Sequence, residues 1–122
     1  MLTYNKMVVQ MSESEQTDLV FRALADSTRR DIVARALKAE HSVSALASSY
    51  AMSFAAVQRH VAVLERAGLV TKHRSGREQL VSSSIESVRG AKELLDRYEE
   101  MWRDRIDRFG EVLAETTRGE QA

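Results

Sequence analysis

Glutamine and arginine side chains recur at helical spacing near the middle of the chain. At about 100° per residue, Val57, Val61 and Leu64 fall on one side of a helix and are expected to face the core. The opposite side carries Ala55, Gln58, Arg59, Ala62 and Arg66. Gln and Arg carry paired hydrogen-bonding groups that match adenine and guanine edges in the major groove of DNA, and small residues between them let a helix enter the groove. The chemistry indicated is hydrogen bonding to bases, although a solvated face of ordinary helix formers has a similar composition.

Both the N-terminus of this helix and the basic turn that follows it suit a polyanion. Ser53, at the helix N-terminus, can bring a hydroxyl and backbone N–H groups to a phosphate. Beyond Gly68, the segment 69–82 is predicted to form a β-hairpin around Ser75 and Gly76. Four basic side chains crowd this turn: Lys72, His73, Arg74 and Arg77. Such a hairpin beside a recognition helix can contact phosphates or the minor groove. A charged turn that serves only solubility is the alternative.

The hydrophobic pattern predicts the elements that hold these residues. Helices are expected over 17–25, from the Asp26 N-cap to about 38, over a short stretch beginning near 43, from the Ser53 N-cap to about 67, and over 86–116. The apolar residues expected to face the core in the second and third helices are Ile32, Val33, Ala36, Leu37, Val43, Leu46, Ala47 and Tyr50. Two short helices joined by a tight turn form a helix-turn-helix. The fold class predicted is mainly α with a small β-hairpin wing: a winged helix-turn-helix with a long C-terminal dimerisation helix.

The domain organisation follows from these elements. Residues 1–16 are expected to be a partly flexible N-terminal arm, 17–116 a single DNA-binding and dimerisation domain, and 117–122 a frayed tail. The 122-residue chain has no net charge, but residues 26–82 hold nine Lys/Arg against five Asp/Glu, and residues 83–122 hold seven against ten. A basic middle and an acidic end fit one face turned to a polyanion.

Composition excludes several classes of protein. The absence of cysteine rules out disulfides, thiolate zinc sites and cysteine nucleophiles. No apolar run reaches the roughly 20 residues that span a bilayer, and the N-terminus lacks the apolar stretch of a signal peptide, so a cytoplasmic protein without membrane contact is expected. An enzyme is not expected, because the chain has no Gly-rich phosphate loop and the acidic pair Glu99 and Glu100 lies on neighbouring helix positions.

Three segments resemble the ArsR/SmtB family of regulators. The segment FRALADSTRRDI (21–32) is similar to the opening of that family, SFAAVQRHVAVLERAGLV (53–70) to its recognition helix and the residues that follow, and Gly76-Arg77 to its wing. The resemblance spans about residues 17–113. It implies a winged helix dimer that represses promoters and is released by an effector. It places Ser53, Ala55, Gln58, Arg59 and His60 at DNA-reading positions, with Arg74 and Arg77 on the wing. Arg29 is assigned mainly to folding contacts, because it lies in a first helical turn beside Asp26.

The chain departs from the metal-sensing members of this family. Their short third helix often begins with a cysteine pair, where this sequence has Ser42 and Ser44, and the last helix has no histidine. His41, His60 and His73 are scattered singly, so no metal and no cofactor are expected. The signal to which such a regulator would respond is left open: it could be a small-molecule effector, a partner protein or none.

The last helix carries an apolar stripe at alternating spacings of three and four residues. Its members are Val88, Ala91, Leu95, Tyr98, Trp102, Ile106, Phe109 and Leu113. A small winged helix core cannot cover so long a stripe, so a second copy is expected to pair with it, as in a coiled coil. The predicted dimer interface is Leu19, Leu95, Tyr98, Trp102, Ile106, Phe109 and Leu113. A helix that folds back on its own core is the alternative.

Together these patterns predict a sequence-specific transcriptional regulator that represses by binding double-stranded DNA as a homodimer. A twofold dimer presents two recognition helices and therefore calls for a palindromic operator. The predicted DNA-binding residues are Ser53, Ala55, Gln58, Arg59, His60, Arg66, Arg74 and Arg77. The alternative is a helical protein-interaction or adaptor module without DNA binding, which would leave the outward face of the helix around Arg59 unexplained.

Overall fold

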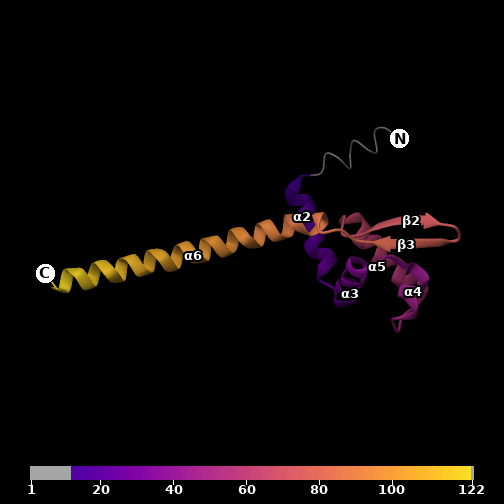
Figure 1. Cartoon of the computed structure of the whole chain (residues 1–122), viewed down its shortest axis with the longest axis horizontal. Helices are drawn as coiled ribbons and strands as arrows, with labels where there is room; N and C mark the ends of the chain where they lie inside the picture. Colours follow the sequence, from indigo (N-terminus) through magenta and orange to yellow (C-terminus); the bar gives the residue numbers. More distant parts are fainter. Residues whose placement is uncertain (1–11, 122) are drawn as a thin grey trace. The chain divides into compact units, whose positions relative to one another are not determined.

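The computed structural model describes residues 12–121 and divides the chain into two compact units, within residues 1–91 and 92–122. The first unit contains helices α2 (Glu13–Leu24), α3 (Ser27–Lys38), α4 (Val43–Ser48) and α5 (Phe54–Arg66), with strands β1 (His41–Ser42), β2 (Thr71–Ser75) and β3 (Glu78–Ser82) (Figure 1). Helix α6 (Glu86–Gln121) begins in the first unit and forms the described part of the second. The predicted class, mainly helical with a small β wing, is confirmed.

Side-chain caps define where the helices begin. Ser12, Asp26, Ser42 and Ser53 each accept a hydrogen bond from the backbone N–H three residues later, which satisfies a donor that the first helical turn leaves free. The caps predicted at positions 26 and 53 are confirmed. Helix α2 begins earlier than predicted, because the Ser12 cap allows the first turn to form before residue 17. Residues 1–11 of the predicted arm lie outside the described part of the chain.

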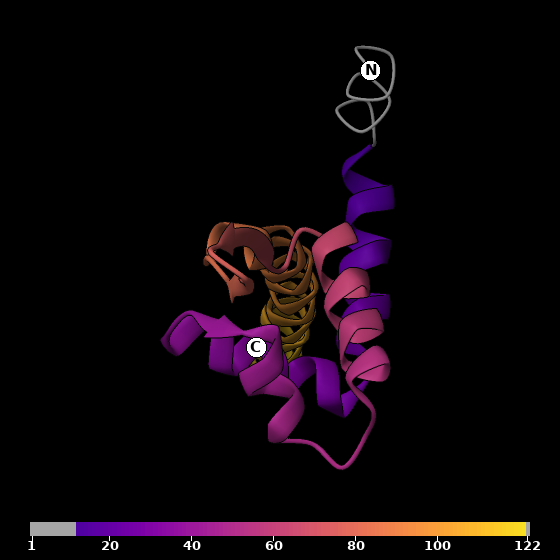
Figure 2. The ribbon, with the colours of Figure 1, turned by 90° about the vertical axis from the view of Figure 1, so that its right-hand side faces the viewer.

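The core lies where α5 packs against α2, α3 and α4. Figure 2 shows α2 and α5 lying side by side. The three α5 residues predicted to face inward are essentially inaccessible to solvent, as are core residues from α3, α4, the sheet and the loop before it: Ile32, Leu46, Val57, Val61, Leu64, Leu69, Val70 and Val81. The prediction for Leu37 is wrong, since that side chain is 48% exposed. Leu37 lies at the edge of the stripe formed by Ile32, Val33 and Ala36, where its side chain is only partly covered.

The sheet has one strand more than predicted. β1 pairs antiparallel with β3 through His41↔Val81 and Ser42↔Leu80, and β2 pairs with β3, which gives the order β1-β3-β2. A strand of two residues shows no alternation in the sequence, so periodicity could not reveal it. The hairpin β2–β3, called the wing below, is confirmed, and Gly76 at its turn has a φ of 63°, a conformation that favours glycine.

Helix α6 continues to Gln121 and does not end near residue 116 as predicted. The hydroxyls of Thr116 and Thr117 bond to the carbonyls of Val112 and Leu113, so these threonines are accommodated within the helix. At its start, Ala91 is buried and Val88 packs against the core of the first unit. The first two residues of the predicted stripe therefore belong to the chain's own core, and the stripe available to a partner begins at Leu95.

Candidate nucleic-acid interface

The outer face of α5 is exposed as its periodicity predicts. Ala55, Gln58, Arg59 and Arg66 are all exposed, whereas the opposite face is buried. The hydroxyl of Ser53 accepts the N–H of Ala56 at 3.1 Å and so caps the helix. The same hydroxyl keeps its own hydrogen for donation to an acceptor beyond the helix N-terminus.

A groove separates α5 from the wing, and we call it the wing-side groove. It gathers residues from α4, α5 and both wing strands: Val43, Ala55, Gln58, Arg59, Val61, Ala62, Lys72 and Gln79. Three predicted site residues therefore line one groove together with two wing residues, Lys72 and Gln79, that were not among the predicted site residues. Lys72 lies 3.6 Å from Glu65, the residue before Arg66 on α5. Gln79 stands opposite Arg74 in the strand register, a proximity that becomes visible only once the hairpin pairing is known.

Two more of the predicted DNA-binding residues lie on the wing. Arg74 and Arg77 are exposed, and neither makes an ion pair with any residue in the described part of the chain. His73 instead lies 3.5 Å from Glu40. A Cβ added to Gly76 would meet no atom within 4 Å, so the turn has open space around it. The two arginines are therefore available to an external anion.

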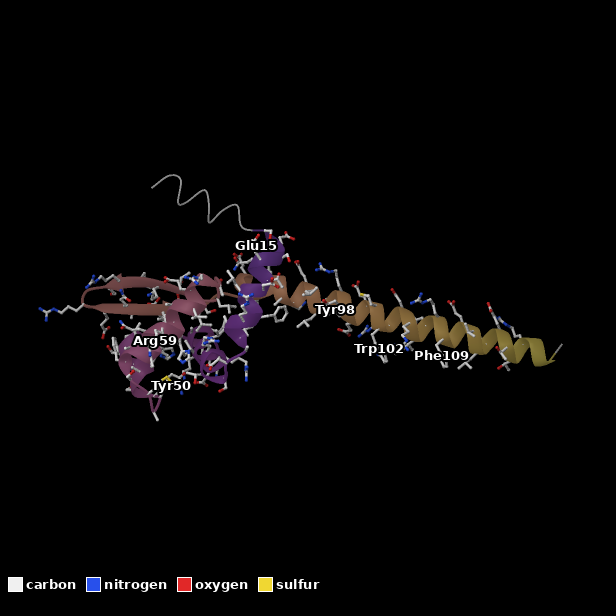
Figure 3. The ribbon with its side chains drawn as sticks, turned by 180° about the vertical axis from the view of Figure 1, so that it is seen from behind. Glu15, Tyr50, Arg59, Tyr98, Trp102 and Phe109 are labelled. Carbon is white, nitrogen blue, oxygen red and sulfur yellow. The ribbon has the colours of Figure 1, made fainter. Side chains whose placement is uncertain are left out.

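A second groove lies on the other side of α5, facing α2. Its lining combines apolar residues with three arginines: Leu19, Arg22, Arg59, Ala62, Val63 and Arg66. Arg59 borders both grooves and stands on the ridge between them, and Figure 3 labels it on α5. Of these two grooves, Arg66 borders the one on the α2 side. The structure thus groups Arg66 with Arg22, which lies in α2 and was not among the predicted site residues.

His60 is half-buried on the flank of α5 and does not belong to the exposed face. Its Nδ1 lies 3.3 Å from Nη1 of Arg29 and 4.0 Å from a carboxylate oxygen of Asp26. Arg29 donates from Nε to the carbonyl of Ala23 at 2.7 Å and from Nη2 to that of Arg22 at 3.1 Å. The folding role predicted for Arg29 is confirmed, because it satisfies carbonyls at the end of α2. The backbone N–H of Arg29, which donates to the carboxylate of Asp26, is the main cause that holds the pKa of Asp26 below its usual value.

A polar cluster ties α3 to the turn between α4 and α5. Tyr50, labelled in Figure 3, donates its hydroxyl hydrogen to Asp31, and Arg35 donates to Asp31 at 2.9 Å and to Ser49 at 3.1 Å. The guanidinium of Arg35 also lies 5.4 Å from the centre of the Tyr50 ring. Burial, aided by the carboxylate of Asp31, raises the pKa of Tyr50 to about 12. The cluster fixes the turn that precedes the Ser53 cap.

Replacement of Tyr50 by Phe should reduce the pH dependence of the free energy of unfolding at alkaline pH. The folded-state pKa of about 12 lies above the ordinary tyrosine pKa of 10.0, so the folded protein holds this proton more tightly than the unfolded chain. The resulting stabilisation is complete below pH 10 and is lost as the pH rises through the folded-state value. Phenolate absorbance of wild type minus Tyr50→Phe isolates this group. A difference titration centred near 10 would contradict the assignment.

The described part of the second unit, α6 from residue 92, exposes its apolar stripe along one side. Figure 3 shows Tyr98, Trp102 and Phe109 on the same side of α6. Six side chains, called the apolar seam below, are each more than half exposed: Leu95 54%, Tyr98 57%, Trp102 57%, Ile106 52%, Phe109 66% and Leu113 53%. Met101 and Val112 widen this surface, at 65% and 57% exposed. A continuous apolar stripe of this kind is typical of an interaction surface.

The described residues offer neither a metal-binding cluster nor a membrane-spanning helix. Within residues 12–121, no three His, Asp or Glu side chains lie together in a way that could hold a metal ion. None of the helices in this range combines the length and the apolar character needed to cross a membrane.

The three-stranded sheet with its wing, the helix-turn-helix of α4 and α5 and the exposed basic face define a winged helix-turn-helix DNA-binding protein. Comparison with known proteins agrees. Residues 24–73 match a family of helix-turn-helix domains. A solved ArsR family transcriptional regulator is 30% identical, with a TM-score of 0.70, over 74% of this chain and 93% of the other. The protein belongs to the ArsR family of transcriptional regulators.

Two further solved structures support this assignment. An ArsR-like transcriptional regulator from Rhodococcus sp. RHA1 is 28% identical over 80% of this chain and 92% of its own, with a TM-score of 0.69. The homodimeric winged helix-turn-helix DNA-binding domain of a possible ArsR-family regulator from Mycobacterium bovis is 26% identical over 70% of this chain and 80% of its own, with a TM-score of 0.57. No curated protein sequence matches the chain.

Proposed function

We propose that this regulator represses transcription by binding a palindromic operator as a homodimer. The observation that carries the proposal is the wing-side groove, where Ala55, Gln58 and Arg59 of α5 lie beside Lys72 and Gln79 of the wing. A recognition helix and an adjacent basic hairpin together supply base contacts and backbone contacts.

The roles of the individual residues follow from their chemistry. Gln58 and Arg59 are the residues on α5 that can form paired hydrogen bonds with adenine and guanine, and Ala55 leaves room for the helix to approach. Ser53 and the free N–H groups at the start of α5 suit a phosphate. Arg74 and Arg77, which have no ion-pair partner among the described residues, suit phosphates or the minor groove. Arg66 adds positive charge on the α2 side.

The homodimer is proposed from the apolar seam of α6. Six large apolar side chains that are each more than half exposed would be covered by the same stripe of a second copy. Leu19, partly buried at the groove beside α2, is proposed to extend this interface. The homodimeric state of the Mycobacterium bovis relative supports the proposal. In this arrangement α5 and the wing bind DNA, whereas Leu19 and the part of α6 beyond residue 91 hold two copies together.

Arg77→Ala tests the backbone contact made by the wing. Because a phosphate contact carries little sequence information, we expect weaker binding to all DNA sequences and a salt dependence of log K that is shallower by about one unit. Fluorescence anisotropy with an operator duplex across a salt series measures both quantities. Arg97→Ala, which removes an exposed arginine on α6, is the matched control. An unchanged salt slope for Arg77→Ala would remove the wing from the proposed interface.

A further inference from the structure

The two ring nitrogens of His60 have different surroundings. Nδ1 lies 3.3 Å from Nη1 of Arg29, whereas Nε2 has no partner among the described residues. No side-chain nitrogen or oxygen that is buried in the described part of the chain lacks a hydrogen-bond partner. Since Nε2 has none, it must reach solvent, in agreement with a side chain that is 22% exposed.

Arg29 determines which nitrogen of His60 carries the proton. A guanidinium has only donors, so Nδ1 must be the acceptor of this hydrogen bond, and a neutral imidazole then carries its hydrogen on Nε2. Arg29 cannot swing away without losing its bonds to the carbonyls of Ala23 and Arg22, at 2.7 and 3.1 Å. The nearest carboxylate, that of Asp26, is 4.0 Å from Nδ1, beyond hydrogen-bond distance. Its Oδ2 already accepts the N–H of Arg29 at 3.0 Å.

The exposed nitrogen lies beside the proposed DNA-binding face. His60 follows Arg59 and is therefore turned by about 100° around α5, onto the flank that faces α2 and α3. When a recognition helix enters the major groove, its flanks face the sugar-phosphate backbone and its outer face meets the bases. Phosphate oxygens only accept hydrogen bonds, so the group opposite them must be a donor.

We propose that Arg29 is a positioning residue that holds His60 as the Nε2–H tautomer, so that His60 donates a hydrogen bond to a DNA phosphate. The proposal rests on the proposed DNA face of α5. It assigns to Arg29 a role in binding in addition to its contacts with the end of α2. It also explains how a half-buried histidine that is bonded to its own fold can contribute to the interface.

The tautomer can be tested on the free protein, without DNA. The chain has three histidines, and a His60→Gln sample identifies the signals of His60 in a long-range ¹H–¹⁵N spectrum of the imidazole rings. We expect a pyridine-type shift for Nδ1 and a pyrrole-type shift for Nε2. In Arg29→Met, Nδ1 loses its donor, and we expect the two tautomers to mix. A pyrrole-type Nδ1 in the wild-type protein would overturn the proposal.

Two substitutions of His60 distinguish the contributions of its two ring nitrogens to DNA binding. The amide of Gln places a donor near the position of Nε2, whereas Asn reaches only the position of Nδ1. We expect His60→Gln to bind the operator about tenfold more tightly than His60→Asn, the effect of one hydrogen bond to a charged group. Equal affinities for the two variants, at equal unfolding midpoints, would overturn the phosphate contact.

The proposed DNA face is tested separately with Arg59→Ala on the same duplex. If Arg59→Ala weakens binding while the Gln and Asn variants are equal, only the role of His60 is wrong. If Arg59→Ala binds as tightly as the wild type, the DNA face is wrong, and the contact of His60 with phosphate is overturned with it. The comparison of His60→Gln with His60→Asn does not use the Arg29→Met protein, so it remains valid if that variant fails to fold.

Discussion

Arg59→Ala should lower operator affinity by about tenfold to a hundredfold and relax the base preference at one position of each half-site, the effect of losing one bidentate contact to a base. Arg59 is exposed, makes no ion pair with a described residue and borders both grooves of α5. Its loss therefore removes no hydrogen bond or ion pair with a described residue, and the free energy of unfolding should change by less than about 0.5 kcal/mol.

The measurement for Arg59 is a set of binding isotherms on the operator and on single-base variants of each half-site, at one fixed salt concentration. The Arg77→Ala protein provides the contrast, because loss of a backbone contact should weaken all duplexes equally. Arg97→Ala controls for the loss of one positive charge. An Arg59→Ala protein with the wild-type base profile would exclude Arg59 from base recognition.

Trp102→Ala should weaken self-association by about thirtyfold to a thousandfold, the range for truncation of a central aromatic anchor, whose cost is about 2–4 kcal/mol. Trp102 lies in the middle of the apolar seam, 57% exposed, and its ring is 5.8 Å from the guanidinium of Arg105. Operator affinity should fall as well, because a single copy contacts only one half-site.

Sedimentation velocity over a concentration series measures the dimer, and the same samples are then used for DNA binding. Trp102 is not a member of the buried core cluster, so the wing and α5 should stay folded in this variant. Half-site affinity of the monomeric variant should therefore persist. A Trp102→Ala protein that remains as dimeric as the wild type would place the interface elsewhere than on α6.

The sequence predicted the parts of the fold that depend on local pattern. The spacing of Val57, Val61 and Leu64 correctly identified the buried face of α5, and Asp26 and Ser53 correctly marked two helix starts. Periodicity works for these residues because neighbours on one helix share one environment. It misjudged Leu37, which lies at the edge of its stripe where burial depends on what packs above it.

The parts that could not be predicted depend on residues that are far apart in the chain. Arg29 and His60 are 31 residues apart, and their contact shows why His60 is half-buried. The placement of Gln79 in the wing-side groove requires the pairing of β2 with β3 as well as the packing beside α5. Strand β1 was not predicted because two residues are too few to show an alternation of apolar and polar side chains. Each case needs tertiary contacts that single-sequence patterns do not encode.

Selection of genomic DNA fragments by the purified protein tests the central claim most directly. We predict that the retained fragments share an inverted repeat whose half-sites are centred about one helical turn, or 10–10.5 base pairs, apart, and that Arg59→Ala no longer enriches it. Retention of fragments without a common sequence, or the same enrichment by Arg59→Ala, would contradict the account of α5 as the recognition helix.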